Sequence, residues 1–116
     1  MLIAAALSLA LIQDPVSHDQ TVTCTGLFTN VFAMTAGTAE RDPTPDNRGT
    51  AEAAAALLRT ADQDRLAAAR REGVSVQASG DALKAWLDGA GDLASAVENH
   101  LDACMAIYWS RAFPDA

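Results

Sequence analysis

The sequence predicts an all-α fold: a small, disulfide-stapled helical bundle with four helices over about 22–38, 50–72, 80–88 and 92–111. Three observations predict this fold. Apolar residues recur every three or four positions, which is the spacing of helices that bury one face. The only two cysteines, Cys24 and Cys104, fall on such faces near opposite ends of the chain. The first residues of the chain indicate export to a compartment in which cysteines pair.

The two cysteines are predicted to form one disulfide between the first and last helices. Each shares a helical face with bulky apolar residues, Leu27, Phe28 and Val31 for Cys24 and Leu101 and Tyr108 for Cys104. Closing a loop of this length stabilises a chain by about 4.5 kcal/mol, which is comparable to the net stability of a small domain. The alternative is two unpaired buried thiols, because free cysteine is a common core residue.

Residues 1–13 are predicted to be a signal peptide, with cleavage between residues 10 and 16. The run from Leu2 to Ile12 is apolar apart from one serine. It is shorter than the about 20 residues that span a bilayer, so we expect no stable membrane insertion. No lysine or arginine precedes the run, and a cytosolic N-terminal helix is the alternative. We expect residues 14–116 to be a single domain of a periplasmic or secreted bacterial protein.

The first helix is expected over 22–38, with Thr21 or Thr23 as its N-cap. The stretch 41–49 follows as a proline-rich loop, because two prolines and a glycine deny it regular structure.

The second helix is expected over 50–72, from an N-cap at Thr50 to a stop at Gly73. A short third helix over 80–88 follows Ser79, a candidate N-cap.

The apolar pattern alone would continue the third helix into the fourth, but Gly89 and Gly91 favour a break there. The disulfide supports the break, because a long unbroken last helix parallel to the first would hold the cysteines too far apart. We therefore expect a fourth helix over 92–111, capped by Asp92 and antiparallel to the first.

The sequence contains no pattern that indicates an enzyme, a cofactor site or a metal site. His100, Cys104 and Cys24 are three potential zinc ligands, whereas a structural site needs four, usually in closely spaced pairs. Glu98, His100 and Asp102 alternate along a helix and splay around it, so the three cannot converge as an acid–base group. We expect a protein without catalytic residues, cofactor or metal.

The formal net charge of −7, with Arg70–Arg71 as the only basic doublet, argues against nucleic acid as a partner. In size, expected compartment and cysteine count, the chain is similar to small exported helical proteins with one disulfide, such as the acid-stress periplasmic chaperones. The resemblance is one of outline, and no site residue is carried over from it.

The last turns of the predicted fourth helix are apolar around most of their circumference. The residues concerned are Met105, Ile107, Tyr108, Trp109 and Phe113. They either sit deep among the other helices or form a patch that faces a partner. We expect a non-catalytic interaction or chaperone-like protein of the envelope, whose partner is another protein or a second copy of itself. The alternative is a bundle that binds a small ligand between its helices.

Overall fold

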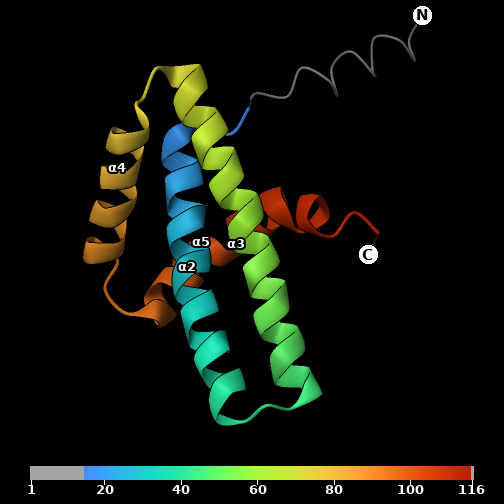
Figure 1. Ribbon diagram of the computed structural model, residues 1–116. Coiled ribbons are helices and arrows are strands. Elements are labelled where there is room, and N and C mark those ends of the chain that lie inside the picture. The colour runs from blue at the N-terminus through green and yellow to red at the C-terminus, as the bar shows by residue number, and fades with distance from the viewer. Residues whose placement is uncertain (1–14, 116) are drawn as a thin grey trace, which may run out of the picture.

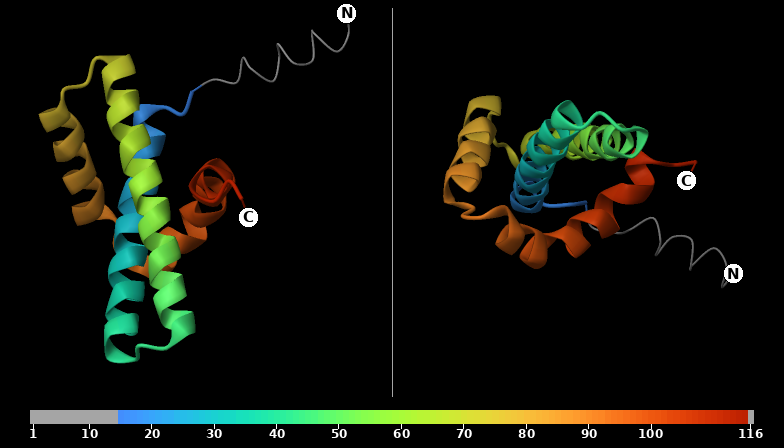
Figure 2. Two further views of the ribbon diagram at one scale, coloured as in Figure 1. Left: turned by 45° about the vertical axis from the view of Figure 1, so that its right-hand side comes forward. Right: turned by 90° about the horizontal axis from the view of Figure 1, so that it is seen from below.

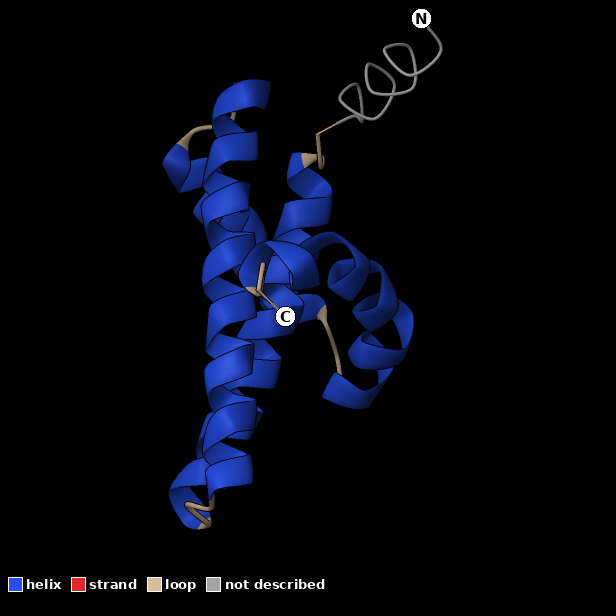
Figure 3. Cartoon of the chain, turned by 90° about the vertical axis from the view of Figure 1, so that its right-hand side faces the viewer, coloured by secondary structure: helices blue, strands red, loops and turns tan. Residues whose placement is uncertain are grey.

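The computed structural model describes residues 15–115, which form an all-α, four-helix fold without a strand (Figures 1 and 3). The helices are α2 (His18–Arg41), α3 (Pro45–Glu72), α4 (Val76–Gly89) and α5 (Leu93–Ala112). The predicted signal peptide, residues 1–13, lies outside the described residues. No helix within residues 15–115 is long and apolar enough to cross a membrane.

Helices α2 and α3 form a long antiparallel hairpin, and the other two helices pack against it (Figures 1 and 2). Helix α4 lies beside the first part of α2, and α5 then crosses one face of the hairpin. The expectation that the last helix runs antiparallel to the first was wrong. With 14 residues against 24, α4 is about 21 Å long beside an α2 of about 36 Å, so the chain turns part-way along α2. Helix α5 therefore reaches the start of α2 by crossing it.

The N-terminal end of α2 differs from the prediction. Ser17 is the N-cap, and its hydroxyl oxygen accepts a hydrogen bond from the Gln20 amide at 3.1 Å. Thr21, a predicted cap, lies inside the helix, where it is fully buried and donates to the His18 carbonyl at 2.6 Å. Serine and threonine both cap helices, so the choice among neighbours depends on where packing begins.

The loop expected over 41–49 is shorter than predicted, because α3 begins at Pro45 rather than near Thr50. Thr44 is the N-cap, and its hydroxyl accepts from the Asn47 amide at 3.1 Å. Proline is favoured at the first helical position, since it lacks an amide proton that would have no partner there. The same residue that suggested a loop thus starts a helix.

Helix α4 also begins earlier than predicted, at Val76, with Ser75 as the N-cap. The hydroxyl of Ser75 accepts from the Ala78 amide at 3.0 Å. Ser79, the predicted cap, is instead fully buried against the hairpin.

The predicted break between the last two helices is confirmed. Helix α4 ends at Gly89, and Gly91 adopts a φ of 70°, in the left-handed region that favours glycine. Asp92 caps α5 as predicted, with its carboxylate accepting from the Ser95 amide at 2.8 Å. This hydrogen bond is the main reason that the pKa of Asp92 lies below its usual value.

The predicted disulfide between Cys24 and Cys104 is present, with the two Cα atoms 5.4 Å apart. Both cysteines are fully buried, and the disulfide ties the second turn of α2 to the middle of α5. Phe28 packs edge-on against Tyr108 beside it, with 6.3 Å between the ring centroids. The remaining buried members of this core are Leu27, Leu57, Ala61 and Ala96.

The start of α2 is held to α3 and α4 by a buried polar junction. Nη1 of Arg65 donates to the hydroxyl of Ser79 at 2.6 Å, and the same hydroxyl lies 2.7 Å from Nε2 of His18. All three side chains belong to buried residues. Asp62 accepts from Nε and Nη2 of Arg65 at 3.0 and 2.8 Å, which pairs the guanidinium charge. The junction joins residues far apart in the sequence and fixes how α4 sits on the hairpin.

Candidate functional site

The five apolar residues predicted near the end of α5 do not share one surface. Tyr108 is fully buried and belongs to the core, whereas Trp109 is 44% exposed. Phe113 packs against the Trp109 indole, with 4.5 Å between ring centroids. Met105 and Ile107 are half-buried, on different sides of the helix. Tyr108 therefore sits deep among the helices, whereas Trp109 is exposed, and its place in a patch that faces a partner stays a prediction.

Met105 and Trp109 lie in an apolar groove of about 240 Å³ between α2, α3 and α5. We call it the apolar groove and define it by its lining residues. These are Phe28, Val31, Thr35, Thr50, Ala53, Ala54, Leu57, Leu101, Met105 and Trp109. None of them is charged, and the only polar ones are two threonines. Met34 lies one helical turn beyond Val31 on α2 and is 52% exposed.

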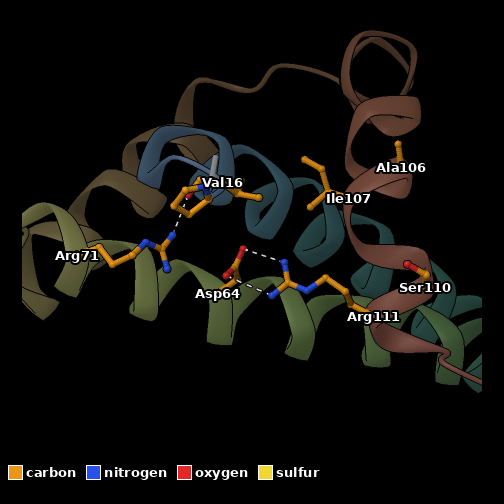
Figure 4. A pocket seen from close by; sticks show the side chains of 8 residues that line it. Val16, Asp64, Arg71, Ala106, Ile107, Ser110 and Arg111 are labelled. Atoms are coloured by element: carbon orange, nitrogen blue, oxygen red, sulfur yellow. Dashed lines mark hydrogen bonds and ion pairs between the residues drawn. The ribbon is translucent and has the colours of Figure 1, made fainter. Parts of the chain in front are cut away.

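Ile107 faces a different hollow, a polar cleft of about 600 Å³ between the end of α5, α3 and the residues before α2 (Figure 4). Arg71 crosses one end of the cleft, where its Nη2 donates to the Val16 carbonyl at 2.9 Å. Arg111 reaches in from α5 toward Asp64 on α3, and their Nη2 and Oδ1 atoms are 3.2 Å apart. The cleft therefore contains two guanidinium groups and one carboxylate.

Asp64 of α3 lies in this cleft and joins α3 to α5 through two partners on α5. The Tyr108 hydroxyl donates to its Oδ2 at 2.6 Å, and Nη1 of Arg111 donates to the same oxygen at 3.3 Å. Burial alone would raise the pKa of Asp64, but these hydrogen bonds and the charges of Arg111 and Arg71 outweigh it and lower the pKa. For Tyr108, burial and then the Asp64 hydrogen bond raise the pKa of the phenol.

We expect Asp64→Asn to remove a pH-dependent part of the stability. The folded-state pKa lies below the unfolded value, so the carboxylate stabilises the fold above about pH 4 and loses this effect as the pH falls through the folded pKa. Urea unfolding of both proteins across this range should show the variant less stable near neutral pH, with the difference shrinking below about pH 4. An equal difference at acidic and neutral pH would contradict this assignment.

The structure gives no convergence of the acidic and histidine side chains considered in the sequence. His100 packs edge-on against Trp86 of α4, with 6.1 Å between ring centroids, and Glu98 and Asp102 are exposed. Both cysteines are used by the disulfide. Within the part of the chain that the structure describes, no group of three or more histidine, cysteine or acidic residues is placed to hold a metal ion.

The sequence did not indicate the close pair of His18 and Ser79, which lie on α2 and α4 and are 61 residues apart in the chain. No local motif indicates such a pair, because it forms only when α4 packs against α2. Neither residue lines the apolar groove or the polar cleft. Arg65 already donates a hydrogen bond to the Ser79 hydroxyl. The pair is therefore accounted for as a packing junction.

Comparison of the chain with family models, with curated proteins and with solved structures finds no match.

Proposed function

We propose that the protein is a non-catalytic interaction protein of the bacterial envelope, and that it binds an apolar segment of a partner protein in the apolar groove. The observation that carries the proposal is the groove itself, with uncharged walls from three helices and the exposed indole of Trp109 at its edge. Tryptophan and methionine are enriched in the centres of protein interfaces. A chaperone-like role, in which the groove holds apolar segments of several partners, is the broader form of this proposal.

The size of the groove favours a protein partner over a small ligand. Pockets that enclose small ligands have volumes of about 300–1,000 Å³, and they cover most of the ligand. A groove of about 240 Å³ instead accommodates a few side chains from a surface that remains mostly outside it. The placement in the envelope is supported by the disulfide, since such bonds persist mainly in oxidising compartments.

The polar cleft supports a second candidate function, the binding of a small anion. Its volume of about 600 Å³ lies within the range of ligand pockets, and Arg71 and Arg111 face it from opposite sides. Asp64 already pairs with Arg111, however, and reduces the positive charge available to a ligand. We therefore rank this candidate second.

Site-specific photo-crosslinking in cells tests the proposal. A benzophenone side chain at position 34, beside the groove, should yield an adduct with a discrete partner, whereas the same group at Lys84 on α4 should not. Adding Ala53→Trp, which fills the groove from a half-buried position, should remove the adduct while circular dichroism and melting show that the fold survives.

Two outcomes would overturn the proposal. The first is the same set of adducts from positions 34 and 84. The second is no adduct from position 34 together with a rise in melting temperature on adding small anions that Arg71→Ala abolishes. The second outcome would replace the proposed function by anion binding in the polar cleft.

A further inference from the structure

Helix α5 covers only part of the hairpin face that it crosses (Figure 2). The part beyond α5, toward the α2–α3 loop, presents the floor of the apolar groove, including Val31, Thr35 and Ala53. No other helix among residues 15–115 lies against this floor. A helix of a partner placed on this floor would lie beside α5, on the same face of the hairpin.

The lining of the groove extends over about two turns of each hairpin helix. It runs from Phe28 to Thr35 on α2 and from Thr50 to Leu57 on α3. Each run is eight residues long, and its ends lie about 10 Å apart at the helical rise. Phe28 and Leu57 are buried, so a partner helix would contact chiefly the end of the lining nearer the α2–α3 loop. Two alanines and two threonines in the floor leave room for a close approach.

The rim of the groove is acidic. On α5, Glu98 and Asp102 precede Trp109 by eleven and seven residues, so helical spacing places them on the groove side, along one edge with Met105. On α3, Asp46 lies one turn before Thr50 on the same face. All three carboxylates belong to exposed residues.

Most cations near these helix faces are directed away from the groove. Helical spacing places Arg48 and Arg59 on the opposite side of α3 from Thr50, Ala53 and Leu57. Arg111 pairs with Asp64 in the polar cleft. Arg41 is the exception, because it donates at 3.5 Å to Thr38, which adjoins the loop end of the groove. The rim therefore carries an excess of negative charge beside an uncharged floor.

We infer that the occupant of the apolar groove is a cationic amphipathic helix of a partner protein, with its apolar stripe on the floor and basic side chains facing Asp46, Glu98 and Asp102. The inference rests on the proposed function and names the chemistry of the partner. A second copy of this chain fits less well, because each copy carries a formal net charge of −7 and like charges oppose association.

Three synthetic peptides test the inference by titration against the full mature chain. Each is about 14 residues long, enough for about four helical turns, and has leucines in one helical stripe. The other positions are lysine, glutamine or glutamate. A lysine peptide of the same composition but with scrambled leucines controls for non-specific attraction to an acidic protein. We expect the striped lysine peptide to bind at least about tenfold more tightly than the glutamate peptide, since several exposed charge pairs change sign.

Paired variants separate the rim charges from the overall charge. Glu98→Gln/Asp102→Asn should weaken binding of the striped lysine peptide by about fivefold, because two exposed pairs are lost. Glu52→Gln/Asp81→Asn removes the same number of charges at exposed sites outside the groove lining and should change affinity by less than about twofold. Ala53→Trp should abolish binding of the striped peptide.

The outcomes distinguish this inference from the proposed function. If the glutamine or glutamate peptide binds as tightly as the lysine peptide, and Ala53→Trp abolishes binding of all three, the groove is a docking site and the charge inference is wrong. If no striped peptide binds better than the scrambled one, the proposed function fails as well. A concentration-dependent dimer that Ala53→Trp disrupts would replace the foreign helix by a second copy.

Discussion

Replacing Cys24 and Cys104 by alanine should lower the free energy of unfolding by about 4.5 kcal/mol. The bond closes a loop with a sequence separation of 80, and its removal gives that conformational freedom back to the unfolded chain. For a domain of this size, the melting temperature should fall by roughly 20 °C or more. Urea unfolding of the oxidised protein and of the variant measures the difference directly.

Reduction of the wild-type disulfide provides the control for this prediction. The reduced protein and the alanine variant should unfold at similar denaturant concentrations, because both lack the covalent link and each retains small side chains at the two positions. Freely alkylatable thiols in protein recovered from its native compartment, or a loss below about 1 kcal/mol, would show that the disulfide does not organise this fold.

Gly26→Ala should destabilise the protein by about 1–3 kcal/mol, although alanine is the better helix former. Gly26 lies in the interior of α2, and Trp86 of α4 packs directly on its backbone. A Cβ atom at this position would overlap the indole ring, so α4 must move away from the hairpin. Thermal or urea unfolding should show the loss, while α2 itself stays helical.

The same substitution in a Trp86→Ala background should have the opposite sign. Without the indole, the new methyl group meets no obstacle, and alanine then stabilises the helix by up to about 1 kcal/mol relative to glycine. A double-mutant cycle of the four proteins isolates this coupling. Equal destabilisation in both backgrounds would mean that the contact between Gly26 and Trp86 does not limit the packing of α4.

The fold class was predictable from helical periodicity, and the break from Gly89 and Gly91. The disulfide was predictable because the chain has only two cysteines and each falls on an apolar helical face. Helical periodicity around Cys24 and Cys104 identified their buried faces. The capping residues were less predictable, since several serines and threonines compete near each helix start and Pro45 fits both a loop and a first helical turn. The crossing of α5 over the hairpin was not predictable, because it follows from the lengths of α2 and α4 and from side-chain packing.

The candidate site was predictable only in part. The spacing near the end of α5 indicated an apolar surface that includes Met105 and Trp109, and these residues do line the groove. The floor of the groove combines residues near 30 and near 54, and the polar cleft combines Asp64, Arg71 and Arg111. Such combinations arise only when α5 is placed on the hairpin, and no spacing along the chain encodes them.

Chemical-shift mapping by NMR tests the central claim, that the apolar groove is the binding site of this protein. With methyl-labelled protein and the striped lysine peptide, shifts should concentrate at Val31, Leu57, Leu101 and Met105 and at the Trp109 indole. Shifts that concentrate instead at Ile107 and the arginines of the polar cleft, or that spread evenly over α4, would contradict the account.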